Sequence, residues 1–230
     1  MASKNSVKIY VEDSFYHIYN RGVEKRNIFE DQQDFSVFLS YLQTYLTPKD
    51  ESGLGTILSS LKSSPGEKDR AIKLLRLKNY SRDVDLLCYA LMPNHFHLLI
   101  RQSNIVLTSF MNSLGTRYSM YFNRKYKRTG VLFQDVYKAV RVQTEEQLLY
   151  LSQYINLNPA MWLGFPPKRW LDAPFPCSLP EYLNLRHTNW IKKEAILNFF
   201  SKTNPHNTYE NFLGMELGAE IIADLAIDSE

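Results

Sequence analysis

His95 and His97 are the first residues whose types and spacing could do chemistry. The segment around them is apolar and predicts a strand, in which alternate side chains share a face, so both imidazoles point one way and Phe96 the other. Two imidazoles at this spacing can reach one divalent ion. The alternative is two polar residues on a half-exposed face, which is the commoner meaning of an isolated His-x-His pair.

Tyr154 and Asn158 form the second pair. They lie four residues apart in a predicted helix that begins at Thr144, so they share one face beside the apolar stripe that docks the helix. Such a helix could present a hydroxyl and an amide oxygen together. Because Pro159 disfavours helical backbone in the residue before it, we expect the helix to stop at Asn158-Pro159. The alternative, favoured by this pair alone, is a core tyrosine and an ordinary helix stop.

A basic and aromatic stretch is the third feature. Between residues 117 and 141 the only acidic residue is Asp135, and the basic residues are Arg117, Arg124, Lys125, Lys127, Arg128, Lys138 and Arg141. Lys and Arg pair with phosphates, and exposed rings stack on unpaired bases. Several of the interleaved rings fit the buried side of a helix, so we expect those to be core. Phosphate contact is the leading interpretation of the basic residues.

Charge is distributed unevenly along the 230 residues. The net charge is +3, but the part of the chain after Lys202 carries six acidic residues and no Lys or Arg, so the remainder carries +9 (+3 plus 6). A polyanion or only a soluble surface would account for this. We find no apolar run long enough to span a membrane and no signal peptide. The two cysteines, far apart in sequence, indicate a reduced, cytoplasmic protein.

The elements that must position these residues follow from periodicity. We predict strands over 7–20, 85–91, 95–101 and 130–142, and helices over 34–46, 69–79, 108–126 and 144–158. Residues 47–68 collect Gly, Ser, Pro and charge, which predicts an exposed loop. A Pro- and Trp-rich irregular segment follows 159, with short helices around 192–200 and 209–225. This order predicts an α+β sandwich with a mostly antiparallel sheet.

The motifs together resemble a known family. Met92-Pro93-Asn94-His95-Phe96-His97-Leu98-Leu99-Ile100 resembles the HUH motif of REP-associated tyrosine transposases, which are single-tyrosine HUH endonucleases related to insertion-sequence transposases. Four further blocks match in order over roughly residues 10–160: Tyr16-His17-Ile18-Tyr19-Asn20-Arg21-Gly22 with Ile28-Phe29, Arg117-Tyr118 with Tyr121-Phe122-Asn123, Gly130-Val131-Leu132-Phe133-Gln134, and Tyr154-Ile155-Asn156-Leu157-Asn158-Pro159. The resemblance implies a ferredoxin-like/RRM-like HUH domain over 1–160, with a C-terminal extension over 161–230 packed on it.

The resemblance also implies roles. Tyr154 matches the nucleophile that forms a 5′-phosphotyrosine link, and His95, His97 and Asn158 match ligands of Mg²⁺ or Mn²⁺. The implied substrate is single-stranded DNA with hairpins. The candidate DNA contacts are Asn20, Arg21, Arg117, Arg124, Lys125, Lys127, Arg128 and Lys138. Asn156 departs from the His usual in the family, and Asp135-Val136 from a Gly-Arg, which leaves the catalytic set whole.

Two other functions remain open. A former transposase retained as a non-catalytic, regulatory binder of DNA hairpins would bind folded single strands without covalent capture. An RNA-binding domain would stack unpaired bases, but it gives no reason for a histidine pair facing a tyrosine. Relatives include dimers that swap the tyrosine helix and monomers with a C-terminal extension, and the extension here favours a monomer over a homodimer.

Overall fold

A four-stranded antiparallel sheet forms the centre of the protein. The computed structural model describes residues 10–201, 203–204 and 206–224. The strands are β1 (Ser14–Arg21), β2 (Val84–Met92), β3 (His95–Gln102) and β4 (Lys138–Arg141), in the order β2-β3-β1-β4. Helix α1 (Gln32–Leu46) joins β1 to β2, and α4 (Leu107–Lys125) joins β3 to β4. This β-α-β-β-α-β order is the ferredoxin-like arrangement, so the predicted fold class is confirmed.

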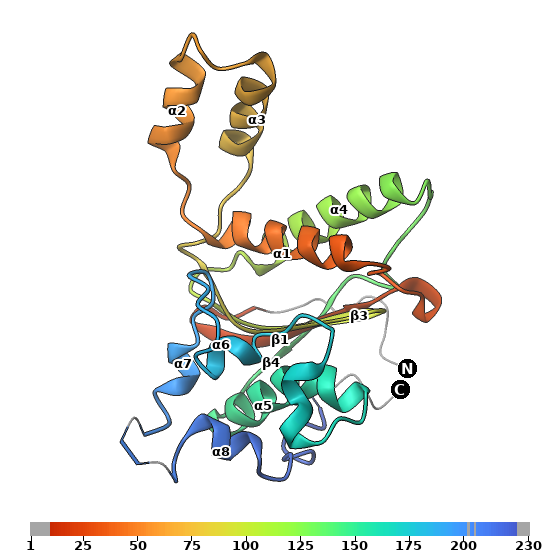
Figure 1. Ribbon diagram of the computed structural model, residues 1–230, viewed down its shortest axis with the longest axis vertical. Helices are drawn as coiled ribbons and strands as arrows, with labels where there is room; N and C mark the ends of the chain where they lie inside the picture. Colours follow the sequence, from red (N-terminus) through yellow and green to blue (C-terminus); the bar gives the residue numbers. More distant parts are fainter. Residues whose placement is uncertain (1–9, 202, 205, 225–230) are drawn as a thin grey trace.

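Helices cover both faces of the sheet (Figure 1). Helices α1 and α4 cover one face, and α5 (Glu145–Trp162) with the C-terminal segments covers the other. Strand alternation divides the apolar side chains of β3 between two cores: Phe96 and Leu98 pack in the core under α1 and α4, and Leu99 packs in the core under α5. The sheet therefore separates two layers with different partners.

Two helices form an arm beyond α1 (Figure 1). One lies where a loop was predicted, and the other begins earlier than the helix predicted after that loop. Residues 47–68 contain α2 (Glu51–Ser59), and the predicted helix over 69–79 begins earlier, as α3 (Pro65–Arg76). Asp50 caps α2, and Ser64 starts α3 with a complete capping box. Ala71 is the one buried residue of the two helices. The two helices pack mainly on each other rather than on the core. Their composition of Gly, Ser, Pro and charged residues therefore predicted a loop.

Strands β1 and β4 and helix α5 differ markedly from their predicted bounds. β1 begins at Ser14 rather than 7, because Asp13 has a positive φ of 48° that interrupts extended backbone; residues 7–9 lie outside the described residues. β4 covers only Lys138–Arg141 of the predicted 130–142. Helix α5 does not stop at Asn158-Pro159 but continues to Trp162. A proline inside a helix costs about 3 kcal/mol, and the buried face of α5 against the sheet offsets this.

The C-terminal extension closes the outer edge of the sheet. Its segments are η2 (Pro167–Asp172), α6 (Leu179–Tyr182), α7 (Glu194–Leu197) and α8 (Tyr209–Leu213), the last two within the predicted 192–200 and 209–225, of which residue 225 lies outside the described residues. Backbone hydrogen bonds from Leu91 N to Pro176 O (2.9 Å) and from Ser178 N to Tyr89 O (3.0 Å) pair this extension with β2. An edge strand that would otherwise offer free hydrogen-bonding groups is covered.

No helix in the part of the chain that the structure describes is long and apolar enough to cross a membrane.

Candidate active site

The histidine pair lies on the face of the sheet that α5 covers. His95 and His97 alternate with Phe96 on β3, and both are buried. Their ring centroids are 5.0 Å apart, and the two ring planes are nearly perpendicular, at 89°. The spacing that suggested two imidazoles on one face therefore brings them together under the helix.

Helix α5 brings Tyr154 to this pair. The Tyr154 ring meets the His97 ring edge-on with centroids 5.4 Å apart. Two turns later the Trp162 ring lies 5.5 Å from the His95 ring. Asn158, also buried, lies midway between these two residues on the same helix face and therefore opposite the histidine pair. The continuation of α5 past Pro159 is what gives Asn158 this fixed direction.

Two buried polar atoms here have no hydrogen-bond partner within the described residues: Nε2 of His97 and Oδ1 of Asn158. Burying a polar atom without a partner costs about 1–3 kcal/mol, so such atoms need an explanation. One imidazole nitrogen and one carboxamide oxygen are a donor set that suits Mn²⁺ or Mg²⁺. The described residues place no group of three or more His, Cys, Asp or Glu side chains to hold a metal, so an ion here would depend on the Asn158 oxygen.

The Nδ1 atoms of His95 and His97 each have a partner within hydrogen-bond distance. His95 Nδ1 lies 2.6 Å from Oδ1 of Asn94, and this oxygen can only accept, so Nδ1 donates. His97 Nδ1 lies 2.9 Å from Nε2 of His17 on β1. Burial, and then the neighbouring His17 and His95, lowers the pKa of His97 well below its usual range. A neutral His97 is the form that ligates metals.

His17 is a site residue that the sequence reasoning did not single out. It is fully buried, stacks on His97 at 5.1 Å, and meets the Tyr154 ring at 6.4 Å. The available signal was its place in the Tyr16–Gly22 block, where a strand puts residues 17, 19 and 21 on one face. That face is shared with the histidine pair once β1 and β3 align.

Arg21 and Lys138 lie on the same face of the sheet as the histidines, Arg21 on the neighbouring strand β1 and Lys138 one strand further, on β4. Arg21 is directly opposite His95, and Tyr19 is directly opposite both His97 and Lys138. Lys138 Nζ lies 5.9 Å from the Tyr19 ring centroid. Arg21 Nε donates to the side-chain oxygen of Gln134 at 2.5 Å. Two predicted DNA contacts therefore border the site.

Other predicted DNA contacts are held within the helical layer. The Arg117 guanidinium lies 3.8 Å from the ring centroid of Tyr41. Lys125 pairs with Asp31 and Asp34, each at 2.7 Å. Arg117 and Lys125 therefore have partners within the protein.

The remaining candidates lie around the end of α4 and the end of β1. Arg124 and Lys127 are exposed. Arg128 donates to Asn123 at 3.0 Å, and Asn20 donates to the Asp135 carbonyl oxygen at 3.0 Å. The helix end therefore presents two solvent-facing basic residues.

Asn156, the departure from the family pattern, contacts the extension. Its amide nitrogen donates to the Tyr209 hydroxyl at 2.8 Å, and its oxygen accepts from the Ser178 hydroxyl at 2.6 Å. All three side chains are buried. The residue at this position therefore joins α5 to the extension in a closed polar network.

The comparisons with known proteins agree with the sequence motifs. Residues 63–158 match the family described as "Transposase IS200 like". No curated protein matches the chain. Among solved structures, a REP-associated tyrosine transposase bound to a REP hairpin is 9% identical, covering 83% of this chain and 98% of its own, with a TM-score of 0.45. A putative transposase from Deinococcus radiodurans R1 is 15% identical, covering 66% and 95%, with a TM-score of 0.36. The match over residues 63–158 confirms the resemblance to IS200-like transposases and supports a transposase-like function.

Proposed function

We propose, from the likeness to IS200-like transposases, that this chain is a single-stranded DNA endonuclease and strand transferase acting on hairpin-bearing DNA. The observation that carries the proposal is the meeting of α5 with the histidine pair. Tyr154 packs edge-on against His97, and the unpartnered His97 Nε2 and Asn158 Oδ1 belong to the same contact. A core tyrosine on its own gives no reason for those two atoms.

The proposed reaction is a phosphoryl transfer from DNA to tyrosine. Tyr154 Oη attacks a backbone phosphorus and loses its proton, a 5′-phosphotyrosine bond forms, and the bond from phosphorus to the 3′ oxygen breaks. The departing 3′ oxygen takes up a proton and leaves as a 3′-hydroxyl, so no net proton is released. A second 3′-hydroxyl can then attack the phosphotyrosine and release the phenol. Since each step exchanges one phosphoester for another, no external energy source is needed.

Several groups of this chain would assist the transfer. A phenol with a pKa near 10 is a weak nucleophile at neutral pH. The cationic Arg21 and Lys138 would bind the phosphate and stabilise negative charge developing on it. His95, His97 and Asn158 would hold a Mg²⁺ or Mn²⁺ ion, which would orient the phosphate and neutralise its charge. The burial of the site would exclude water as a competing nucleophile.

A second candidate, a non-catalytic binder of DNA hairpins, is favoured by the burial of the tyrosine. The Tyr154 side chain is only 3% exposed. In the enzyme, a phosphate can reach Tyr154 only if α5 moves; at the end of this helix Trp162, 52% exposed, lies on His95. In a binder no such movement is needed.

Covalent capture separates the two candidates. The protein is incubated with labelled hairpin-bearing single strands and Mn²⁺, and adducts are resolved on a denaturing gel. The enzyme predicts an adduct that Tyr154→Phe abolishes, while Tyr150→Phe, on the same helix but away from the histidines, retains it. Salt-sensitive binding with no adduct from any strand supports the binder, and an adduct that survives in Tyr154→Phe excludes this nucleophile.

A further inference from the structure

We infer that the cavity between α4 and residues 130–137 binds one unpaired nucleobase of the DNA strand; this inference rests on the proposed function. The cavity has a volume of about 620 Å³, within the range of small-ligand sites. Phe96, one of its lining residues, faces away from His95 and His97 on β3. The cavity therefore lies across the sheet from the catalytic face and is separate from the metal site.

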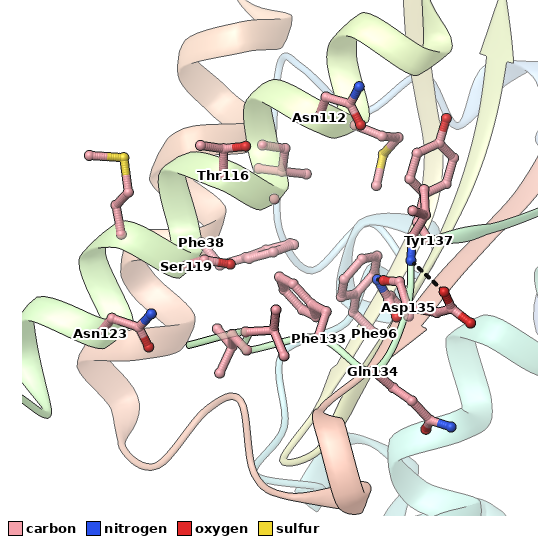
Figure 2. A pocket seen from close by; sticks show the side chains of 18 of the residues that line it. Phe38, Phe96, Asn112, Thr116, Ser119, Asn123, Phe133, Gln134, Asp135 and Tyr137 are labelled. Carbon is pink, nitrogen blue, oxygen red and sulfur yellow. Dashed lines mark hydrogen bonds between the residues drawn. The ribbon is translucent and has the colours of Figure 1, made fainter. Parts of the chain in front are cut away.

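One wall of the cavity is a polar row on α4 (Figure 2). Asn112, Thr116, Ser119 and Asn123 line it, and their spacing of four, three and four residues places them on one helix face. Asn112 and Thr116 are exposed and Ser119 is half-buried, so their polar groups are accessible to a ligand. Amide and hydroxyl groups match the donors and acceptors on the edge of an unpaired base.

The other walls are aromatic and aliphatic. The half-buried Phe133 ring meets Phe96 edge-on at 6.0 Å, and Figure 2 shows both rings beside the polar row. Met120, Val131 and Val136 line the same cavity and are 67%, 70% and 66% exposed. A base has two apolar faces and a polar edge, and a site with apolar walls and one polar row complements that pattern.

Charge favours a nucleic acid over an apolar ligand here. The exposed Arg124 and Lys127 lie at the end of α4 next to Asn123, where the wall of the cavity ends. The part of the chain before residue 203 carries the positive charge excess. Asp135 is the acidic residue among the lining residues. A base in the cavity would keep its phosphates within reach of these basic side chains.

The cavity and the catalytic face meet around the end of β1. Asn20 lines the cavity, whereas Arg21, the next residue, is directly opposite His95. Gln134 also lines the cavity, and it holds Arg21 twice, through its side chain at 2.5 Å and through its backbone N–H to the Arg21 carbonyl oxygen at 2.9 Å. One strand could therefore place a phosphate beside His95 and a neighbouring base in the cavity.

The test fills the cavity from a position that tolerates it. Gly115 lines the cavity, and a Cβ built there meets no atom within 4 Å. Gly115→Phe would occupy the space, and Thr116→Phe does so from an exposed neighbouring position. Gly55→Phe is the matched control, because Gly55 lies on α2, outside the cavity, and is equally open. Thermal melting checks that each variant folds.

Binding is measured with hairpin-bearing single strands in which each flanking nucleotide in turn is abasic, without metal so that no cleavage occurs. We expect one abasic position to weaken binding to the unmodified protein about tenfold or more. Gly115→Phe and Thr116→Phe should weaken binding of the intact strand by a similar factor and make the abasic substitution neutral. Gly55→Phe should behave as the unmodified protein does.

Three other results overturn the inference. They are a uniform response to all abasic positions, a filled cavity that binds like Gly55→Phe, and an abasic effect that persists unchanged in both filled variants. The adduct assay keeps the proposals apart. If the filled variants bind DNA normally and still form the adduct, the base site is ruled out and the nuclease is not. If the cavity binds a base but no adduct forms, the nuclease is ruled out and the base site is not. A protein that binds no strand removes both.

Discussion

The Nδ1 atom of His97 and the Nε2 atom of His17 lie 2.9 Å apart in the buried layer between the sheet and α5. For His97 to ligate an ion through Nε2, its Nδ1 must carry the proton and donate it to His17. His17 is then a positioning residue, which fixes the tautomer and the ring of a ligand without touching the ion. Partners of this kind change metal affinity by about 10–100-fold.

Replacing His17 should therefore weaken metal binding. We expect His17→Leu to raise the Kd for Mn²⁺ about 10–100-fold, because His97 loses its acceptor. His17→Gln, whose side-chain oxygen can take the place of Nε2, should restore most of the affinity. Isothermal titration calorimetry of folded variants measures this without any activity assay. Equal affinity in His17→Leu and the unmodified protein would remove the positioning role.

The tyrosine should act on its own chain. Helix α5 packs on its own sheet, and the extension occupies the β2 edge, so we expect a monomer by light scattering. Mixing Tyr154→Phe with His97→Ala should then give no DNA adduct, because neither chain holds a complete site. Recovery of adduct in the mixture would show that the helix is exchanged between chains.

Asn156 should matter for stability rather than for metal binding. Asn156→Ala leaves the buried hydroxyls of Tyr209 and Ser178 without this partner, at a cost of about 1–3 kcal/mol. Urea unfolding should show this loss, and the exposed control Asn198→Ala should stay within about 0.5 kcal/mol of the unmodified protein. Asn156→His should also destabilise, because the extension fills the space around the amide. An unchanged unfolding midpoint in both variants would contradict the network.

Lys125 and Arg124 should separate a structural from a DNA-binding cation. Lys125→Met leaves the buried Asp34 without its cationic partner and should lower the free energy of unfolding by about 3–5 kcal/mol. Arg124→Met, one residue away and exposed, should leave stability within about 0.5 kcal/mol and weaken binding of single strands. Urea unfolding and salt-dependent binding measure the two effects. If Lys125→Met instead weakened binding of single strands and left stability unchanged, Lys125 would be the phosphate contact.

The thiols should be unreactive in the folded protein. Burial raises the pKa of Cys88 to about 12 and that of Cys177 to about 11. At pH 8 the reactive thiolate of Cys88 would then be about one part in 10⁴. Mass spectrometry after iodoacetamide treatment should find both thiols unmodified in buffer and alkylated in urea. Rapid labelling of the folded protein at pH 8 would show that this region opens.

The parts that the sequence predicted well carry strong local periodicity. The hairpin around Met92-Pro93-Asn94, helices α1 and α4, and the shared face of Tyr154 and Asn158 follow from alternation and helical spacing. The failures lie where tertiary contacts decide. Helix α5 continues past Pro159 because one face of it is packed against the sheet. Strand β4 is short because residues 131–134 pair with the chain just after β1 through a single bridge, between Gly22 and Phe133.

His17 shows the same limit within the site. Its pattern on β1 predicts only a face, and which residue meets His97 depends on the register between β1 and β3, which pairs His17 with Leu99 and Tyr19 with His97. No local signal in a single sequence gives that register. The imidazole pair on β3 is visible because both members belong to one strand.

The unbroken course of α5 through Pro159 makes one rigid rod of three side chains: Tyr154, the proposed nucleophile, Asn158, the proposed metal ligand, and Trp162, whose indole lies on His95. These three side chains cannot leave the histidines one at a time by helix motion. If α5 tilted to admit a strand, Tyr154 and Asn158 would move away from the histidines together, and they would return together when the helix settled back. Entry of the DNA would then control the position of the phenol and of the amide oxygen in one movement.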